Sequence, residues 1–152
     1  MVGTSVIENK LGFKEKVQVF ELALSQLPNA VAGRDSEKLC PLKHTFVEGS
    51  YIREIFMPKG TILTSKIHKI CHPYFIMKGE VSVVTEEGTV KIKAPFQGIT
   101  KPGTKRAIYV HEDCVWITVH STNETDLDKI EDQIIAKNFD ELPNSIKKEQ
   151  II

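Results

Sequence analysis

Two histidines and a lysine stand at a spacing that lets them share one site. Residues 60–79 read GTILTSKIHKICHPYFIMKG, with Lys66 two residues before His68 and His72 four residues after it. Side chains two residues apart on a strand point to the same face. Proline disfavours continued sheet pairing, so Pro73 interrupts that strand before a second one begins. The pattern predicts a hairpin that brings one ammonium group and two imidazoles together.

These residue types allow two kinds of chemistry. Imidazoles bind zinc, iron, copper or nickel, so His68 and His72 are candidate ligands of a divalent transition metal. Lysine and arginine side chains oppose a metal cation and instead bind phosphate or carboxylate strongly. A catalytic metal usually needs three protein ligands, which this stretch does not supply. We therefore expect a site for a small anion without a cofactor, and keep the metal and an internal salt-bridge network as alternatives.

The spacing Gly60-x5-Lys66-x-His68-x3-His72-x6-Gly79 resembles the first motif of the cupin superfamily, Gly-x5-His-x-His-x3-Glu-x6-Gly. Residues 101–106 (KPGTKR) resemble the second motif, with Arg106 in place of its histidine. The resemblance implies a jelly-roll barrel whose interior holds these four side chains. Of the usual cupin metal ligands, three histidines and a glutamate, only His68 is unchanged.

Several stretches are also similar to cupin-like proteins encoded by tailed bacteriophages. They are Lys66 to Lys69, Ala94 to Phe96, Lys101 to Arg106, and His111 to His120, within roughly residues 40–140. One use that this resemblance implies is the sequestration of a nucleotide signal of the bacterial host. Another is a structural or assembly role in the virion.

The order of elements favours an all-β, jelly-roll cupin barrel with flanking N- and C-terminal α-helices. From Lys43 onward, short β-rich runs alternate with turn residues, including expected turns at Lys78-Gly79 and at Glu112-Asp113. We expect one domain, with an N-terminal helix and linker over 1–40, the barrel over 41–122, and a C-terminal helix and tail over 123–152. An apolar stripe predicts the first helix and Pro28 its end, and the stripe comprises Phe13, Val17, Phe20, Leu24 and Leu27. Thr125 with Asp128 predicts the cap of the last helix, which should run to Phe139 or Leu142.

Strand parity adds two residues to the candidate site. Arg53 lies within a predicted strand, on the face opposite to Glu54. Trp116 shares one face with Cys114, Thr118 and His120; we expect a core residue there, with stacking on a ligand ring as the alternative. The candidate ligand-binding set is Lys66, His68, His72, Arg106, Arg53 and Trp116.

Composition narrows the class of partner. The 152 residues carry 20 basic and 20 acidic side chains, which argues against a nucleic-acid polymer bound through a large basic surface. No apolar run reaches the ~18 residues that a membrane span needs, so no membrane partner is expected. Three cysteines, an odd number, favour reduced thiols and a cytoplasmic protein, in the host cytoplasm if phage-encoded. The apolar stripes on both helices predict self-association as a homodimer or larger.

Three hypotheses follow from these observations. We prefer a non-enzymatic binding protein with a cationic barrel pocket for a small anionic molecule, such as a nucleotide or sugar phosphate. The first alternative is a metal-dependent cupin enzyme, of isomerase or dioxygenase type, that uses His68 and His72. The second alternative is a virion structural or assembly protein with a filled barrel.

Overall fold

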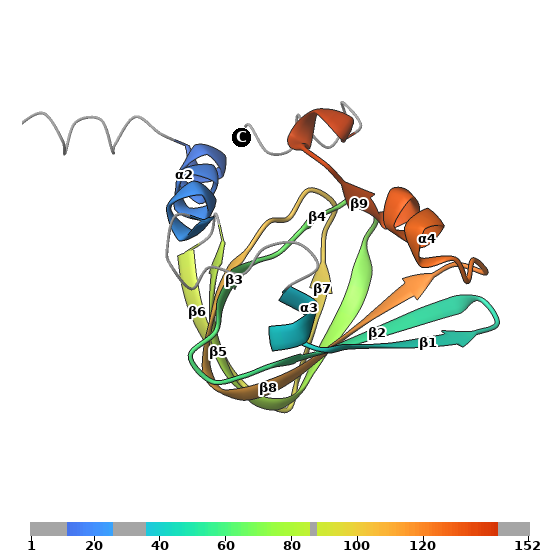
Figure 1. Cartoon of the computed structure of the whole chain (residues 1–152), viewed down its shortest axis with the longest axis horizontal. Helices are drawn as coiled ribbons and strands as arrows, with labels where there is room; N and C mark the ends of the chain where they lie inside the picture. Colours follow the sequence, from blue (N-terminus) through green and yellow to red (C-terminus); the bar gives the residue numbers. More distant parts are fainter. Residues whose placement is uncertain (1–11, 26–35, 86–87, 143–152) are drawn as a thin grey trace, which may run out of the picture.

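The computed structural model describes residues 12–25, 36–85 and 88–142, and it shows strands curled into a barrel with helices at its sides (Figure 1). The helices are α2 (Phe13–Ser25), α3 (Ser36–Leu39), α4 (Leu127–Ile134) and the 3-10 turn η2 (Phe139–Glu141). The strands are β1 (Leu42–Val47), β2 (Ser50–Met57), β3 (Ile62–Thr64), β4 (Ile67–His68), β5 (His72–Thr85), β6 (Gly88–Lys93), β7 (Phe96–Thr100), β8 (Ala107–Ser121) and β9 (Ile135–Ala136).

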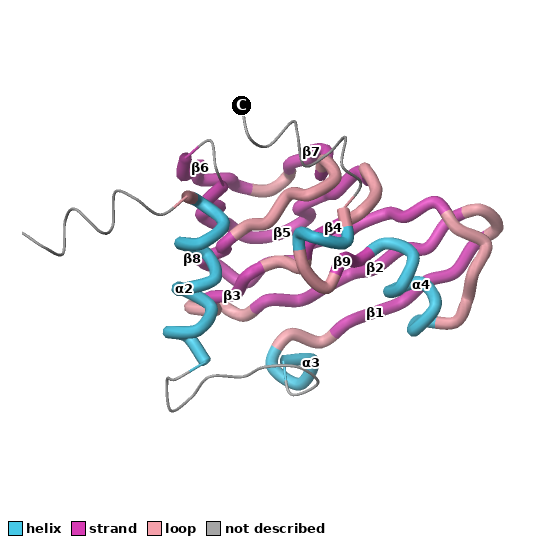
Figure 2. Tube along the Cα trace, turned by 90° about the horizontal axis from the view of Figure 1, so that it is seen from above, coloured by secondary structure: helices cyan, strands magenta, loops and turns pink. Residues whose placement is uncertain are grey.

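The strands form one large antiparallel sheet and one small one. The large sheet has the order β1-β2-β8-β5-β6, while β3 also pairs with β8 and β7 with β5. The small sheet contains only β4 and β9. Seen from above in Figure 2, α2 lies beside the end of the barrel that carries β6, and α4 lies near β2 and β9. The predicted all-β jelly-roll barrel with flanking helices is confirmed.

The register aligns side chains of one sheet face into rows that cross five strands. A middle row joins Gly98, Tyr74, Thr118, Arg53 and His44 on β7, β5, β8, β2 and β1. The row toward α4 contains Thr100, His72, His120, Tyr51 and Phe46, and the row on the other side contains Phe96, Ile76, Trp116, Ile55 and Leu42. Polar and apolar side chains therefore occupy different levels of the same interior.

The predicted hairpin over residues 60–79 is wrong. β3 pairs with β8 and β4 pairs with β9, so neither strand pairs with β5. The turn predicted at Lys78-Gly79 is also wrong, because β5 continues through both residues to Thr85. Gly79 has φ +94, and a Cβ there would stand 2.3 Å from the backbone oxygen of Asp113. The glycine therefore allows a bulge, marked by register shifts against β8, instead of a chain reversal.

The bulge changes which residues of β5 face the interior. Before it, His72, Tyr74 and Ile76 are buried, and after it Val81 and Val83 are buried. β8 keeps one parity throughout and likewise runs through the turn predicted at Glu112-Asp113. The turn residues were misleading there because long-range pairing with β5 and β2 outweighs local propensity.

The C-terminal helix is shorter than predicted. Its N-cap is Asp126, whose side chain accepts hydrogen bonds from the backbone amides of Asp128 and Lys129, so the cap predicted at Thr125 is wrong by one residue. α4 ends at Ile134, because Ile135 enters the pairing of β9 with β4. In α2, Val17 of the predicted stripe is buried, and Leu27 and Pro28 lie outside the described residues.

One large apolar cluster fills the barrel, and two small clusters lie beneath the C-terminal segment. The large cluster contains Cys40, Met57, Tyr74, Ile76, Val81, Val83, Ile92, Ile108, Val110, Cys114 and Trp116. The small ones contain Tyr51, Ile130 and Ile134, and Ile67, Ala136 and Leu142. Among the described residues, no helix has the length and apolar character that a membrane crossing requires.

Candidate functional site

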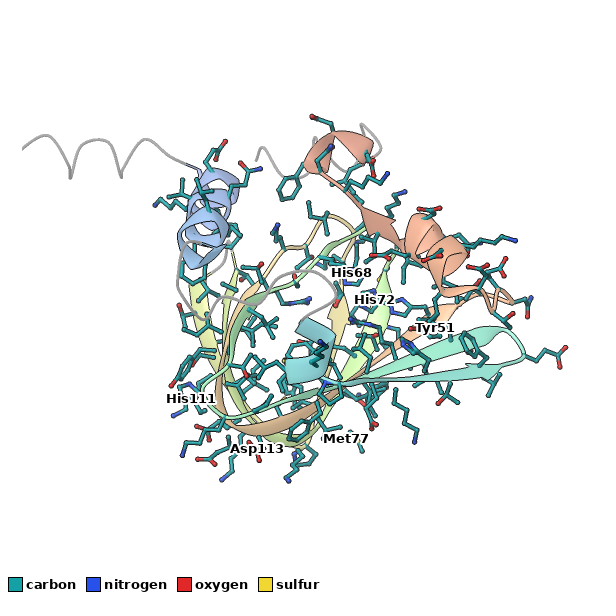
Figure 3. All side chains as sticks on the ribbon, in the orientation of Figure 1. Tyr51, His68, His72, Met77, His111 and Asp113 are labelled. Atoms are coloured by element: carbon teal, nitrogen blue, oxygen red, sulfur yellow. The ribbon has the colours of Figure 1, made fainter. Side chains whose placement is uncertain are left out.

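Three histidines meet at one end of the barrel interior. The ring centroids of His68 and His72 are 4.3 Å apart, and His120 lies 4.5 Å from His72 and 5.9 Å from His68. Figure 3 shows His68 and His72 on the side of the barrel where α4 and β9 lie, with Tyr51 nearby. We call His68, His72 and His120 the histidine cluster. The predicted proximity of His68 and His72 is confirmed, although through β4 and β5 separately and not through a hairpin.

Backbone contacts fix the two histidines that the sequence singled out. His68 pairs with Ile135 of β9, and its carbonyl oxygen accepts a hydrogen bond from the amide of Gly103 at 2.8 Å. His72 begins β5 opposite Thr100, and its Nδ1 lies 3.2 Å from the carbonyl oxygen of Ile70. A carbonyl oxygen only accepts, so Nδ1 of His72 carries the proton and its Nε2 has a free lone pair when the ring is neutral.

His120 was not part of the predicted site. It stands near the end of β8, is 3% exposed, and its Nε2 lies 3.0 Å from Oγ1 of Thr118. The sequence placed it on the face of Trp116, but not at the level of His72. The register sets that level: Tyr74 pairs with Thr118, and these residues stand two positions from His72 on β5 and from His120 on β8. Strand parity combined with the correct register would have found it.

Arg106 is buried beside the cluster, and none of the described residues gives it an acidic partner. It is 8% exposed, its Nη1 donates to Oγ1 of Thr100 at 3.1 Å, and its guanidinium carbon lies 5.1 Å from the centroid of the Tyr74 ring. In the part of the chain that the structure describes, no carboxylate forms an ion pair with it. The internal salt-bridge network kept as an alternative is therefore not found for Arg106 among these residues.

The backbone around Arg106 explains how a loop residue reaches the interior. The amide of Arg106 donates to Oγ of Ser65 at 2.9 Å, and the amide of Ser65 donates to the carbonyl oxygen of Arg106 at 2.8 Å. The Tyr74 ring beneath the guanidinium lies against Gly98, where a Cβ would stand 2.6 Å from the ring. A glycine at position 98 thus makes room for the aromatic surface that Arg106 covers.

Two further predicted residues have different environments. Arg53 is half-buried in the row of Thr118, and its charge contributes to lowering the pKa of both His68 and His120. Trp116 is 6% exposed and stacks on Tyr74 at 4.8 Å within the large apolar cluster. The interpretation of Trp116 as a core residue is confirmed.

Lys66 does not face the interior. Its Nζ forms an ion pair with the carboxylate of Glu131 on α4, and its side chain is 59% exposed. The expectation that it shares a pocket with His68 and His72 is wrong, because β4 turns away to pair with β9 and leaves the side chain of position 66 at the surface. The site therefore carries less positive charge than the sequence indicated.

Burial keeps the histidine cluster neutral near pH 7. Desolvation, followed by the nearby positive charges of His72 and His120, lowers the pKa of His68 to about 3. Desolvation and the same kind of repulsion lower the pKa of His120 to about 4. Burial also lowers the pKa of His72. The cationic character of the site therefore comes from guanidinium groups, since burial lowers the pKa of Arg106 but an arginine stays protonated in proteins.

A metal ion does not fit these side chains as they are placed. Within the described ranges, no group of three or more His, Cys, Asp or Glu side chains has an arrangement that could hold one. Of the four cupin ligand positions, Lys66 points outward and Arg106 brings a positive charge that opposes a metal cation. His68 Nδ1 is buried and has no hydrogen-bond partner among the described residues, so it remains an unsatisfied polar atom of the cluster.

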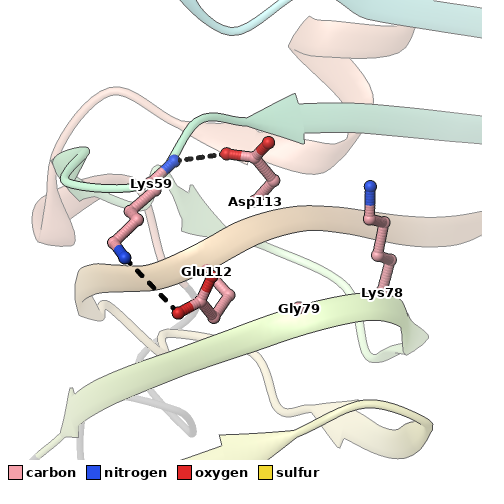
Figure 4. A pocket seen from close by; sticks show the side chains of 5 residues that line it. All are labelled: Lys59, Lys78, Gly79, Glu112 and Asp113. Atoms are coloured by element: carbon pink, nitrogen blue, oxygen red, sulfur yellow. Dashed lines mark hydrogen bonds and ion pairs between the residues drawn. The ribbon is translucent and has the colours of Figure 1, made fainter.

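Two surface depressions formed by described residues lie away from the cluster. One of about 420 Å³ is lined by Lys59, Lys78, Gly79, Glu112 and Asp113. Figure 4 shows two contacts there: Lys59 Nζ lies 3.5 Å from Oε1 of Glu112, and the Lys59 amide donates to Oδ1 of Asp113. Another, of about 520 Å³, lies on the outside of β5 and β7, beside Phe75 and Ile99.

Comparison with known proteins supports the fold. No protein-family model matches the sequence, and no curated protein matches it. The structure is similar to ectoine synthase from P. lautus, with a TM-score of 0.51 and 12% identity over 72% of this chain and 82% of that one. It is also similar to a cupin-2 domain protein from Shewanella frigidimarina, with a TM-score of 0.46 and 8% identity over 74% of this chain and 95% of that one. At such low identity the likeness concerns the fold alone.

Proposed function

We propose that this protein is a non-enzymatic, cupin-fold binding protein that holds a small anionic molecule at the histidine cluster. The observation that carries the proposal is the buried guanidinium of Arg106, which has a hydroxyl and an aromatic ring as neighbours and no carboxylate among the described residues. An unpaired buried charge costs several kcal/mol, so a bound anion would relieve a real energetic defect.

The neighbouring groups suit a phosphate or a carboxylate. A guanidinium group can bind either of these anions through two parallel hydrogen bonds. Hydroxyls of Thr100 and Thr118 border the site, and His68 Nδ1 is a polar atom without a partner. A bound anion would also favour the protonated forms of His68 and His120, and so add donors where the free protein has neutral rings. We therefore name nucleotides and sugar phosphates as the first ligands to test.

The resemblance to phage-encoded cupin-like proteins adds a biological role to the proposal. A protein that binds a nucleotide without converting it would lower the free concentration of a host nucleotide signal. We propose this sequestration, in the cytoplasm of the infected cell, as the use of the site.

Thermal-shift measurements test the binding proposal. Inorganic phosphate, nucleoside monophosphates and a sugar phosphate are each added to the wild type, to Arg106→Ala and to Lys101→Ala. Lys101 is an exposed cation on the same loop and serves as the matched control. A ligand at 100 times its Kd should stabilise the wild type and Lys101→Ala by about 2.7 kcal/mol. Arg106→Ala should lose this stabilisation while remaining folded, and full stabilisation of that variant would overturn the proposal.

The second candidate is the metal-dependent enzyme, and one observation favours it. His120 adds a third imidazole to His68 and His72, the number of protein ligands in many catalytic zinc sites, although the three described rings as placed do not form a metal-binding group and would have to rearrange. Elemental analysis of protein purified without chelator or histidine tag separates the candidates. About one transition metal per chain, lost in His68→Ala, would replace the anion proposal. Neither metal nor ligand stabilisation, together with a stable oligomer, would favour the structural role.

A further inference from the structure

Most of the candidate site is buried, and the C-terminal part of the chain lies against it; of the three histidines, only His68 is partly exposed. His72 and His120 are each 3% exposed and Arg106 is 8% exposed, so a ligand cannot reach them without movement of a covering element. Residues 127–142, which we call the C-terminal cover, comprise α4, β9 and η2. Figure 1 shows them along the side of the barrel where β4 lies.

The cover contacts one member of the site directly and a second one through Tyr51. β9 pairs with β4 so that Ile135 lies opposite His68, and the amide of Lys69 donates to the carbonyl oxygen of Ile134 at 2.8 Å. α4 packs Ile130 and Ile134 against Tyr51. The Tyr51 ring in turn stacks on His120, with ring centroids 5.8 Å apart. Removal of the cover would therefore expose one histidine directly and unpack the neighbour of another.

The attachment of the cover is weak compared with the barrel that it closes. Its apolar contacts belong to the two small clusters, which are separate from the large cluster of the barrel. Its ladder with β4 is two residue pairs long, whereas β5 pairs with β8 over nine. Two lysine contacts, from Lys66 to Glu131 and from Lys69 Nζ to the carbonyl oxygen of Asp132, are exposed. Segments with few buried contacts open at a lower free energy than the whole domain.

We propose that the C-terminal cover opens as a unit, with the barrel intact, and that this opening controls access to the histidine cluster. The identity of the molecule admitted rests on the proposed function. The opening itself does not, because any small reagent that reacts with imidazole can report it. Lys66, which the cupin resemblance places inside the barrel, acts here as an outer contact that favours the closed form.

A reversible cross-link between the cover and the barrel tests the proposal. Ile67 and Ala136 are paired residues of β4 and β9, and Cα atoms of directly opposed residues lie about 4.5–5.5 Å apart, within the range of a disulfide. The variant Ile67→Cys/Ala136→Cys is made in a Cys71→Ser background, because Cys71 is exposed whereas Cys40 and Cys114 are buried. Oxidation locks the cover, and dithiothreitol releases it in the same protein.

The readout is the rate at which diethyl pyrocarbonate modifies each histidine, measured by mass spectrometry at pH 7. We expect His72 and His120 to react at least tenfold more slowly in the oxidised than in the reduced variant. His111, half-buried at the side of Ser82 and Tyr109, is the internal control and should react equally in both. Equal rates at His72 and His120 in the two forms would show that access does not require the cover and would overturn the proposal.

Hydrogen exchange of the wild type gives a second, mutation-free test. Amides of the cover, together with that of Lys69, should exchange at least tenfold faster than the amides of Val81 and Val110 in the barrel. Exchange of the cover only at the rate of global unfolding would also overturn the proposal. Both readouts are independent of any anion. A failed ligand screen together with a positive access result would therefore reject the proposed function and leave the opening of the cover standing. Ligand stabilisation together with equal access in the oxidised and reduced variants would reject the opening of the cover and leave the proposed function standing.

Discussion

The two ends of the barrel interior are built by the same strands from opposite chemistry. On β5, His72 lies at the end beneath the cover and Val81 at the other, and both are at most 3% exposed. On β8, the buried residues change from Ile108 and Val110 to Thr118 and His120. The apolar end needs nothing but packing. The polar end buries groups that valine or isoleucine would replace at lower desolvation cost, and the proposed ligand site rests on this difference.

The largest effect should come from the apolar end. Met57 is 1% exposed within the large cluster, and Met57→Ala removes its contacts and leaves a cavity, so the free energy of unfolding should fall by about 2–5 kcal/mol. Met77 on β5 is 59% exposed, and Met77→Ala is the matched control with an expected change below about 0.5 kcal/mol. Urea denaturation measures both. Similar losses in the two variants would mean that this end is not the packed core.

The polar end should differ through its response to acid. Histidines of the unfolded chain titrate near pH 6.5, whereas the folded pKa values of His68 and His120 are about 3 and about 4. Between pH 6.5 and the folded pKa of each histidine, the unfolded state binds more protons than the folded state does. The stability that is present above pH 6.5 is therefore lost as the pH falls through this range. Each histidine contributes up to about 1.4 kcal/mol per pH unit in that window.

Substitution of one histidine sharpens this expectation. His120→Phe keeps an aromatic ring and removes the titration, so the slope of unfolding free energy against pH between 6 and 4.5 should decrease by about 1.4 kcal/mol per pH unit. Thr118→Val removes the hydroxyl near His120 without removing a titrating group, and should keep the slope of the wild type. An unchanged slope in His120→Phe would place the acid sensitivity elsewhere. Denaturation series in citrate–phosphate buffers supply the comparison.

The smallest effect should lie outside both ends, at the ion pair between Lys66 and Glu131. Both side chains are more than half exposed, so a double-mutant cycle with Lys66→Ala and Glu131→Ala should give a coupling below about 1 kcal/mol that decreases with added salt. A coupling of several kcal/mol, insensitive to salt, would contradict the placement of Lys66 at the surface.

The sequence predicted the barrel well because its signals are local. Turn residues at Gly49 and at Gly60, which have φ values of +81 and +86, bound β2 as expected. Signals failed where pairing between distant segments decides the outcome. Lys78-Gly79 and Glu112-Asp113 have the composition of turns, yet each continues a long strand because its partners hold the backbone extended.

The same contrast between local signals and distant pairing explains why only part of the site was predicted. The cupin spacing brought His68, His72 and Arg106 to one place, since it encodes strand positions within a known barrel. It placed Lys66 wrongly, because the pairing of β4 with β9 depends on the C-terminal segment and not on the motif. It missed His120, whose level beside His72 follows from the register of β8 against β5.

Gly79 has a consequence for how this chain tolerates insertions and deletions. The bulge there lets buried residues with even numbers on one side and odd numbers on the other face the same interior. Loss of Gly79 would exchange the two faces of the half-strand that follows it. Ser82 and Val84 would then be directed into the barrel, and Val81 and Val83 toward solvent. The number of residues between Ile76 and Val81 therefore cannot change without turning the strand over, whereas individual surface residues of the strand can be replaced.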